Sequence, residues 1–170
     1  MGLFDKLFKK EEAVSLPALN IADGDIVAIA DGSLIDIHSV SDPMFAEEMM
    51  GKSTAFKFTQ DKVTICAPAN GTLSAMFPTG HAFGITMPNG MELLVHIGVD
   101  TVNAKGDGFK LLGKKQDDTV KAGDPIVEVD IKKLSQHYDM STMLVITDDN
   151  GIEVEFADPM PVTRGQKVTK

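Results

Sequence analysis

Two of the four histidines in this chain, His81 and His96, lie on either side of an Asn89-Gly90 dipeptide within a mainly apolar stretch. A neutral imidazole is a nucleophile, a proton acceptor and a metal ligand near neutral pH. Two imidazoles brought together can therefore transfer a chemical group or bind a metal. Which chemistry applies depends on the elements that hold the two rings.

The Asn89-Gly90 dipeptide predicts a β-hairpin, because a two-residue type I′ turn needs a positive φ at both central residues. A two-residue loop pairs Phe83 with His96. Side-chain alternation then puts His81 and Phe83 on the same face of the sheet as His96. His81 becomes a diagonal neighbour of His96, at a Cα separation of roughly 7–8 Å. The hairpin thus predicts that the two imidazoles meet among apolar side chains.

The residues that follow His96 offer groups suited to anion chemistry. The backbone amides of Ile97 and Gly98 are candidates to face a bound oxyanion, and Asp100 brings a carboxylate to the same rim. A neutral imidazole beside hydrogen-bond donors is typical of nucleophilic catalysis. We therefore predict His96 as the nucleophile.

Two other interpretations of the pair stay open. Both histidines can be core residues, although burying two imidazoles requires a hydrogen-bond partner for each, and Thr79 is the candidate partner that would fix the tautomer of His81. The pair can also bind zinc, but a catalytic zinc site normally has three protein ligands. Asp100 or His38 is the candidate third ligand, and no His-x-His or His-Glu-x-x-His spacing occurs.

Several apolar residues are candidates to surround the histidine pair. Methionine-rich surfaces adapt to the shape of a docking partner, and ten methionines in 170 residues favour such a face here. We therefore predict that part of this set binds another protein. Its members are Met44, Phe45, Met49, Met50, Phe77, Leu94 and Val99.

Composition limits the class of protein. A formal net charge of −9 argues against nucleic acid as a partner, since phosphates attract a basic surface, and favours a basic protein instead. The single cysteine, Cys66, excludes an intramolecular disulfide and fits a reducing cytosol. No apolar run approaches the roughly 20 residues of a membrane span. We predict a cytoplasmic protein.

Turn signals separate short strand-like segments from residue 21 onward. This spacing predicts an all-β protein, a compact sandwich or barrel, in a single domain over residues 21–170. Two helical turns are expected at 43–50 and 131–138, capped by Asp42 and Asp130. Residues 1–20 are expected to form a flexible tail. Its first ten residues place two leucines and two phenylalanines on one face beside lysines, which suits contact with a membrane surface.

Motifs along this domain resemble the glucose-type enzyme IIA of the bacterial phosphoenolpyruvate-dependent sugar phosphotransferase system. The resemblance runs in order from about residue 21 to the end of the chain. The amphipathic start also resembles the N-terminus of stand-alone members. The matching pieces are Cys66-Ala-Pro-Ala-Asn-Gly71, Gly80-His-Ala-Phe83, Glu92-Leu-Leu-Val-His-Ile-Gly-Val-Asp-Thr-Val102, Lys105-Gly-Asp-Gly-Phe109 and Lys121-Ala-Gly-Asp124.

The resemblance implies an antiparallel β-sandwich that carries a phosphoryl group on a histidine and needs no cofactor or metal. His96 matches the residue that accepts this group from the histidine phosphocarrier protein and passes it to a cysteine of the IIB domain of a sugar permease. His81 matches the second active-site histidine, which Thr79 would orient. Asp42 and Asp100 match acidic positions that meet an arginine of the phosphocarrier.

Two features depart from the family pattern, namely Leu94, where an aromatic residue is common, and the methionine content near Met44. Both affect the expected choice of partner rather than the chemistry. Two alternatives remain, a zinc-dependent hydrolase of a related β-fold and a regulatory module that binds proteins through the same face. The sugar is not readable from the chain, because the permease recognises it.

Overall fold

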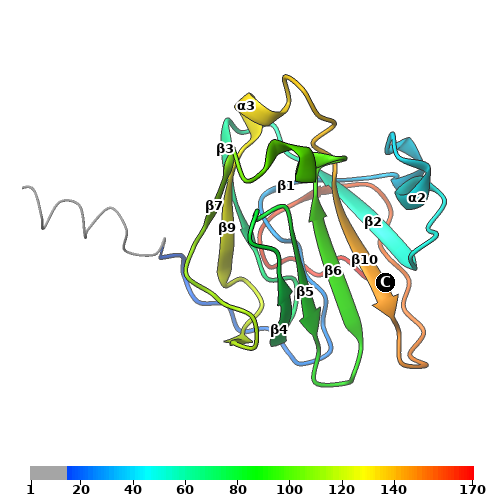
Figure 1. Ribbon diagram of the computed structural model, residues 1–170. Helices are drawn as coiled ribbons and strands as arrows, with labels where there is room; N and C mark the ends of the chain where they lie inside the picture. The colour runs from blue at the N-terminus through cyan, green and yellow to red at the C-terminus, as the bar shows by residue number, and fades with distance from the viewer. Residues whose placement is uncertain (1–14) are drawn as a thin grey trace, which may run out of the picture.

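The computed structural model describes residues 15–170, which form two antiparallel sheets packed face to face (Figure 1). This β-sandwich is the predicted fold. The eight-stranded sheet has the order β11-β1-β2-β10-β6-β5-β4-β8, and the three-stranded sheet has the order β3-β9-β7. The strands are β1 Gly32–Ile35, β2 Lys52–Lys57, β3 Lys62–Cys66, β4 Gly71–Met76, β5 Ala82–Thr86, β6 Glu92–Ile97, β7 Phe109–Leu111, β8 Thr119–Val120, β9 Pro125–Asp130, β10 Thr142–Asp148 and β11 Pro161–Val162.

Two apolar clusters pack on opposite faces of the large sheet. The larger cluster lies between the sheets and includes Leu93 and Val95 of β6 together with Val127 and Val129 of β9. The smaller cluster includes Phe45 and is built on the outer face of the large sheet. Side chains of β6 therefore alternate between the main core and this second, outer cluster.

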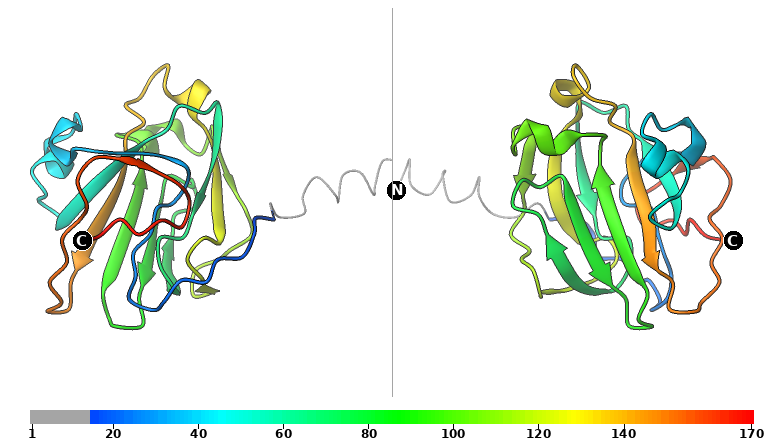
Figure 2. Two further views of the ribbon diagram at one scale, coloured as in Figure 1. Left: turned by 180° about the vertical axis from the view of Figure 1, so that it is seen from behind. Right: turned by 45° about the vertical axis from the view of Figure 1, so that its right-hand side comes forward.

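Within residues 15–170, four short helices connect the strands: η1 Ile37–Ser39, α2 Pro43–Ala46, η2 Thr101–Ala104 and α3 Ile131–Leu134. Both predicted caps are confirmed, because the carboxylates of Asp42 and Asp130 accept hydrogen bonds from the amides of Met44 and Lys133. The helices are shorter than predicted. In Figure 2 the end of β6 lies between η2, which follows it in green, and α2 in blue.

The hairpin between β5 and β6 differs from the prediction by one residue. Met87 and Met91 face each other, and the amide of Gly90 donates to the carbonyl of Met87, so the loop has three residues. Gly90 has a φ of 86°, while Asn89 is not among the residues of positive φ, which excludes a type I′ turn. Pro88 explains the difference, because its fixed φ favours the first central position of a type I turn.

The shifted register reverses the predicted faces. His96 pairs with Ala82, and Phe83 pairs with Val95. Phe83 is therefore buried in the main core, on the face opposite His96, and our prediction that these two side chains share a face was wrong. The ring of His96 instead stands on the outer face of the large sheet, where Phe45 of the second cluster contacts it.

The start of the described chain packs against the domain. The guanidinium of Arg164 donates to the carbonyl of Pro17, and the Leu19 side chain lies over Gly123 and Gly165. The predicted amphipathic segment at residues 1–10 lies outside the described residues, and the division at residue 20 stays a prediction. Within residues 15–170, no helix has the length and apolar character needed to cross a membrane.

Candidate functional site

His96 is held at the outer end of β6 by the backbone that follows it. Its Nδ1 lies 2.8 Å from the carbonyl oxygen of Gly98. A carbonyl only accepts, so Nδ1 carries the proton and donates, and Nε2 keeps its lone pair. Gly98 has a φ of 79°, and a Cβ there would lie 2.5 Å from the Cγ2 of Thr101. Only glycine lets the chain turn its carbonyl back to the ring at this point.

His81 is buried, with an exposed fraction of 4%. Its Nδ1 lies 2.5 Å from the hydroxyl oxygen of Thr79, which is the contact predicted from the sequence. When this hydroxyl donates to Nδ1, the proton of the neutral ring is on Nε2, which then becomes a hydrogen-bond donor. The ring centroids of His81 and His96 are 5.4 Å apart, at an interplanar angle of 80°.

The two rings meet for a reason that the register alone does not give. Ala82 pairs with His96, so strict alternation would point the preceding residue, His81, to the opposite face. His81 stands just before β5, after a turn in which Gly80 has a φ of 79°. Only its carbonyl joins the ladder, where it accepts from the amide of Ile97 at 2.7 Å. The predicted proximity is confirmed, although the predicted register was wrong.

Both imidazoles are biased towards the neutral form. Burial lowers the pKa of His96 below its ordinary value, against opposing effects from the Gly98 hydrogen bond and from the charges of Asp42 and Asp100. Burial and the nearby ring of His96 lower the pKa of His81. At neutral pH, His96 therefore presents a neutral nitrogen with a free lone pair, as a nucleophile requires.

Aromatic rings lie against both histidines. Phe45 of α2 is 5.0 Å from the His96 ring, and Phe77 is 5.2 Å from the His81 ring in an edge-to-face contact, measured between centroids. Phe45 is buried, whereas Phe77 is 42% exposed. The pair is thus apolar on two sides, and Phe77 belongs to an exposed apolar surface, here called the apolar rim.

The other predicted surface residues divide between this rim and the second cluster. Val99 is a buried member of the second cluster, and Leu94 packs against that cluster. Met44, Met49 and Met50 of α2 and the turn that follows it are exposed by 47%, 69% and 36%. Exposed methionines in the helix that carries Phe45, and in the turn after it, fit a docking surface.

The sequence analysis did not single out Val102, one of the exposed apolar residues of the described chain. Val102 is 52% exposed and lies in η2, directly after the loop that carries Asp100. In the sequence it marks only the end of an apolar run. Asp100, the residue before η2, has a left-handed backbone with a φ of 59°, which no pattern of residue types indicates.

The predicted backbone donors are engaged elsewhere. The amide of Ile97 donates to His81, and the amide of Gly98 donates to the carbonyl of Ser141 at 3.1 Å. We therefore do not assign these amides to a bound oxyanion. The group that matters at Gly98 is its carbonyl, which the sequence analysis did not consider.

The candidate third metal ligands do not complete a metal site. The Nδ1 of His38 lies 2.7 Å from the carboxylate of Asp36, on the exposed surface. Asp100 acts on His96 through its charge. Within residues 15–170, no group of three or more histidine, cysteine, aspartate or glutamate side chains is arranged to hold a metal ion.

A neutral histidine pair on the outer face of an antiparallel sandwich, ringed by exposed apolar residues, defines a protein that exchanges a small group with docked partners. Comparison with known proteins gives the family. Residues 24–152 match the model of the phosphoenolpyruvate-dependent sugar phosphotransferase system, EIIA 1. The chain belongs to this family and is a phosphoryl carrier, a transferase component, of a sugar phosphotransferase system.

Several relatives are named as glucose-specific components of such a system. The chain is 34% identical to the glucose-specific EIIA component of Staphylococcus epidermidis, over 96% of this chain and 95% of the relative. It is 37% identical to that of Halalkalibacterium halodurans, over 89% and 87%. It is also 38% identical to the glucose-specific EIICBA component of Staphylococcus carnosus, over 85% of this chain but only 21% of that longer protein.

A solved structure shares the fold. The glucose permease IIA from Mycoplasma capricolum superposes with a TM-score of 0.79 at 33% sequence identity, covering 90% of this chain and 98% of that one. The structural match extends over nearly the whole described domain.

Proposed function

We propose that Nε2 of His96 accepts a phosphoryl group from the histidine phosphocarrier protein and passes it to a cysteine of a IIB domain. One observation carries this assignment. The carbonyl of Gly98 accepts a hydrogen bond from Nδ1 of His96, so the lone pair of the neutral ring is on Nε2. The lowered pKa of His96 keeps that lone pair free of a proton at neutral pH.

The transfer exchanges one bond for another. The Nε2 lone pair of His96 attacks phosphorus as the bond between phosphorus and the donor histidine breaks, and the donor ring recovers its electron pair. The phosphorylated ring of His96 is then a cation with its proton on Nδ1. The Gly98 carbonyl and the carboxylates of Asp42 and Asp100 stabilise that charge. In the second step a cysteine thiolate attacks phosphorus, and the electron pair returns to Nε2.

His81 supports the phosphoryl group in this scheme. With the Thr79 hydroxyl as donor to Nδ1 of His81, Nε2–H is free to donate to a phosphoryl oxygen. Phosphoryl transfer requires mainly in-line positioning and charge stabilisation, so one well-oriented donor has a large effect.

Besides binding a partner, the apolar rim protects the phosphorylated ring from water. Met44 and Phe77 are exposed in the free protein and become covered when a partner docks. Covering them excludes water from the phosphorylated ring and slows its hydrolysis. Residues Met49, Met50 and Val102 extend the same kind of surface.

Variants at three histidines test the proposal. With phosphoenolpyruvate, enzyme I and the phosphocarrier, His96→Gln should abolish labelling of the chain. His81→Gln should still accept phosphate but donate it poorly to a IIB domain. His38→Gln is the matched control, since His38 is exposed and bonded to Asp36, and it should behave as wild type. Normal labelling of the His96 variant would contradict the assignment of His96 as the phosphoryl acceptor.

The choice of sugar is tested through the acceptor. The relatives are named as glucose-specific, so a glucose-specific IIB domain is the first acceptor to use. A panel of IIB domains for different sugars, assayed with the same phosphorylated chain, should show fastest transfer to this one. Faster transfer to another member of the panel would reassign the sugar but leave His96 as the carrier.

A further inference from the structure

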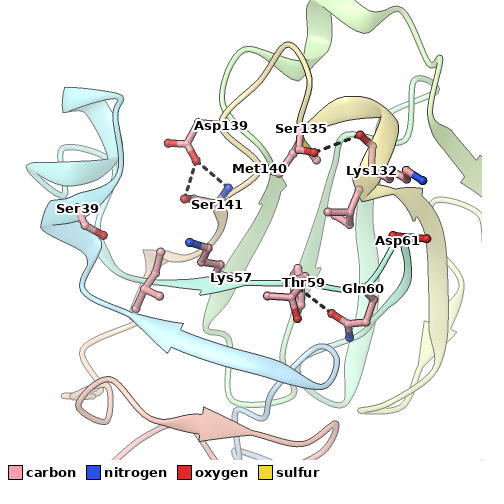
Figure 3. Close-up of a pocket in the computed structure, with 13 residues that line it drawn as sticks. Ser39, Lys57, Thr59, Gln60, Asp61, Lys132, Ser135, Asp139, Met140 and Ser141 are labelled. Atoms are coloured by element: carbon pink, nitrogen blue, oxygen red, sulfur yellow. Dashed lines mark hydrogen bonds between the residues drawn. The ribbon is translucent and has the colours of Figure 1, made fainter.

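A carboxylate outside the histidine pair collects four hydrogen bonds from two separate segments. Asp139 lies between α3 and β10. Its Oδ1 accepts from the amide and hydroxyl of Ser141 at 3.0 and 2.7 Å. Its Oδ2 accepts from the amide and hydroxyl of Ser41 at 3.2 and 2.8 Å. Figure 3 shows Asp139 and Ser141 bonded together at one wall of a surface groove.

Through Ser141, this network is connected to the backbone that binds Nδ1 of His96. The amide of Gly98 donates to the carbonyl of Ser141, and the amide of Val99 donates to the carbonyl of Asp139 at 2.8 Å. The Gly98 carbonyl in turn holds Nδ1 of His96. A shift of the Asp139–Ser141 turn would therefore move the acceptor that sets the tautomer of His96.

Through Ser41, the network is connected to the helix that packs against the ring of His96. Ser41 directly precedes Asp42, whose carboxylate caps α2. The helix carries Phe45, which lies against the His96 ring. Asp139 thus joins the segment that bears this aromatic wall to the segment that fixes the ring nitrogen, although Ser41 and Asp139 are 98 residues apart in the sequence.

The Asp139 carboxylate is held by neutral donors. Partial burial acts to raise its pKa, but the hydrogen bonds from Ser141 and Ser41 outweigh burial and hold the pKa below its ordinary value. Within residues 15–170, no lysine, arginine or histidine forms an ion pair with Asp139. Substituting one serine at a time therefore removes part of the network without leaving an unpaired positive charge.

The serines around the groove beside Asp139 are not arranged to bind a molecule in it. The hydroxyls of Ser39 and Ser135, which line it, already donate to the carbonyls of Asp36 and Lys132. The two serines on Asp139 likewise point their donors at the carboxylate rather than into the groove. The arrangement constrains the loops around the histidines.

We propose that Asp139 is a positioning residue for phosphoryl transfer, which ties the Ser41–Asp42 segment to the Ser141–Gly98 contact and so fixes His96 in the tautomer with a free Nε2. The inference rests on the proposed role of His96 but does not depend on which partner delivers the phosphoryl group. It predicts that loss of either tether changes His96 without removing any group that touches phosphate.

The test uses Asp139→Asn, Ser41→Ala and a control, Asp130→Ala, in the full chain. An asparagine keeps one acceptor oxygen but turns an NH₂ towards the donors of one serine. Ser41→Ala removes a single hydroxyl and leaves the fold least disturbed. Asp130→Ala removes the cap of α3, a comparable local bond with no link to His96.

Two readouts separate positioning from stability. Ring ¹⁵N NMR should show His96 almost wholly Nδ1-protonated in the wild type and in Asp130→Ala, and a mixture of tautomers in Asp139→Asn. Phosphoryl acceptance should slow by roughly ten-fold in Asp139→Asn, mainly in the maximal rate rather than the KM, because small misplacements of a reacting group lower rates steeply. Ser41→Ala should show a smaller change in the same direction.

Each remaining outcome decides the proposal. Unchanged His96 tautomer in Asp139→Asn overturns it, whether or not the rate falls, and so does an unchanged rate. A wild-type chain that the phosphocarrier fails to label would refute the proposed function instead. The tautomer comparison between Asp139→Asn and Asp130→Ala would still decide whether Asp139 positions His96.

Discussion

At the scale of single residues, the carbonyl of Gly98 determines which nitrogen of His96 is free, and burial determines whether that nitrogen is protonated. The charges of Asp42 and Asp100 oppose burial, so the pKa is lowered less than burial alone would lower it. On the proposed phosphorylated ring, which is also a cation, these charges act in the same sense, because they favour a positively charged ring in both states. The same two carboxylates thus moderate the free state and stabilise the loaded one.

The lowered pKa values predict the pH dependence of transfer. The pKa values of both His81 and His96 lie below the ordinary value of 6.5, so the neutral form of His96 predominates at pH 6.5 and its half-titration falls at lower pH. The rate of phosphoryl acceptance should therefore rise with pH as His96 loses its proton and reach half of its plateau value below pH 6.5. Measuring the rate against pH with one donor preparation checks this. A rate already halved at pH 7 would contradict it.

The same shifts fix the sign of the stability change. Below pH 6.5 the unfolded chain binds protons at these histidines before the folded chain does. The free energy of unfolding contributed by the pair should therefore rise with pH from the folded pKa values up to 6.5, with no further gain above. Urea unfolding of wild type and His81→Gln across this range measures the difference. A pair contribution that falls as pH rises would contradict the burial argument.

At the scale of elements, turns and loops position the site more than strands do. The strands, the outer helix α2 and the caps at Asp42 and Asp130 follow from residue patterns, and so does the contact of Thr79 with His81. The hairpin register did not, because Pro88 favours a type I turn where Asn89-Gly90 suggested type I′.

The Asp139 network shows a second limit of sequence reasoning. Its donors come from Ser41 and Ser141, and neither the residue types nor their spacing indicates that the three meet. Such contacts arise from how the segment before α2 lies against the turn before β10. Residue patterns predict periodic elements well, because periodicity is local, but a contact between distant loops depends on the packing of the whole fold.

Gly98→Ala tests the role of the loop after β6. The left-handed backbone and the contact of the new Cβ with Thr101 should cost about 2 kcal/mol in the free energy of unfolding. Phosphoryl acceptance should also slow, because the carbonyl that holds His96 must move. Chemical denaturation and labelling kinetics measure the two effects.

Gly151→Ala is the matched control for this variant. Gly151 has a φ of 77°, close to that of Gly98, but nothing lies within 4 Å of the position of its Cβ. It should lose only about 1 kcal/mol from backbone strain and transfer phosphate at the wild-type rate. Equal losses of stability and rate in both variants would mean that crowding at Gly98 plays no part.

At the scale of the whole molecule, charge and exposed apolar surface act at different stages of docking. The net charge of −9 attracts a basic partner over distance, while the apolar rim around the histidines acts only on contact. Long-range attraction raises the association rate, and the apolar contacts hold the complex and exclude water. The two contributions should therefore respond differently to salt.

Salt dependence separates these contributions. Between about 0.05 M and about 0.5 M NaCl, the association rate with the phosphocarrier should fall by roughly ten-fold, because mobile ions screen the attraction. The dissociation rate should change little. Stopped-flow binding measures both rates, and Met44→Ala should show the reverse pattern, with faster dissociation and an unchanged salt slope. An association rate independent of salt would remove the electrostatic part of the account.

The most direct test of the central claim is the position of the phosphoryl group on the phosphorylated chain. With ¹⁵N-labelled histidine, ³¹P–¹⁵N NMR should find one phosphohistidine, at Nε2 of His96, with the proton on Nδ1. That result follows from the hydrogen bond between Nδ1 and the Gly98 carbonyl. A phosphoryl group on Nδ1 of His96, or on any other histidine of the chain, would contradict the account.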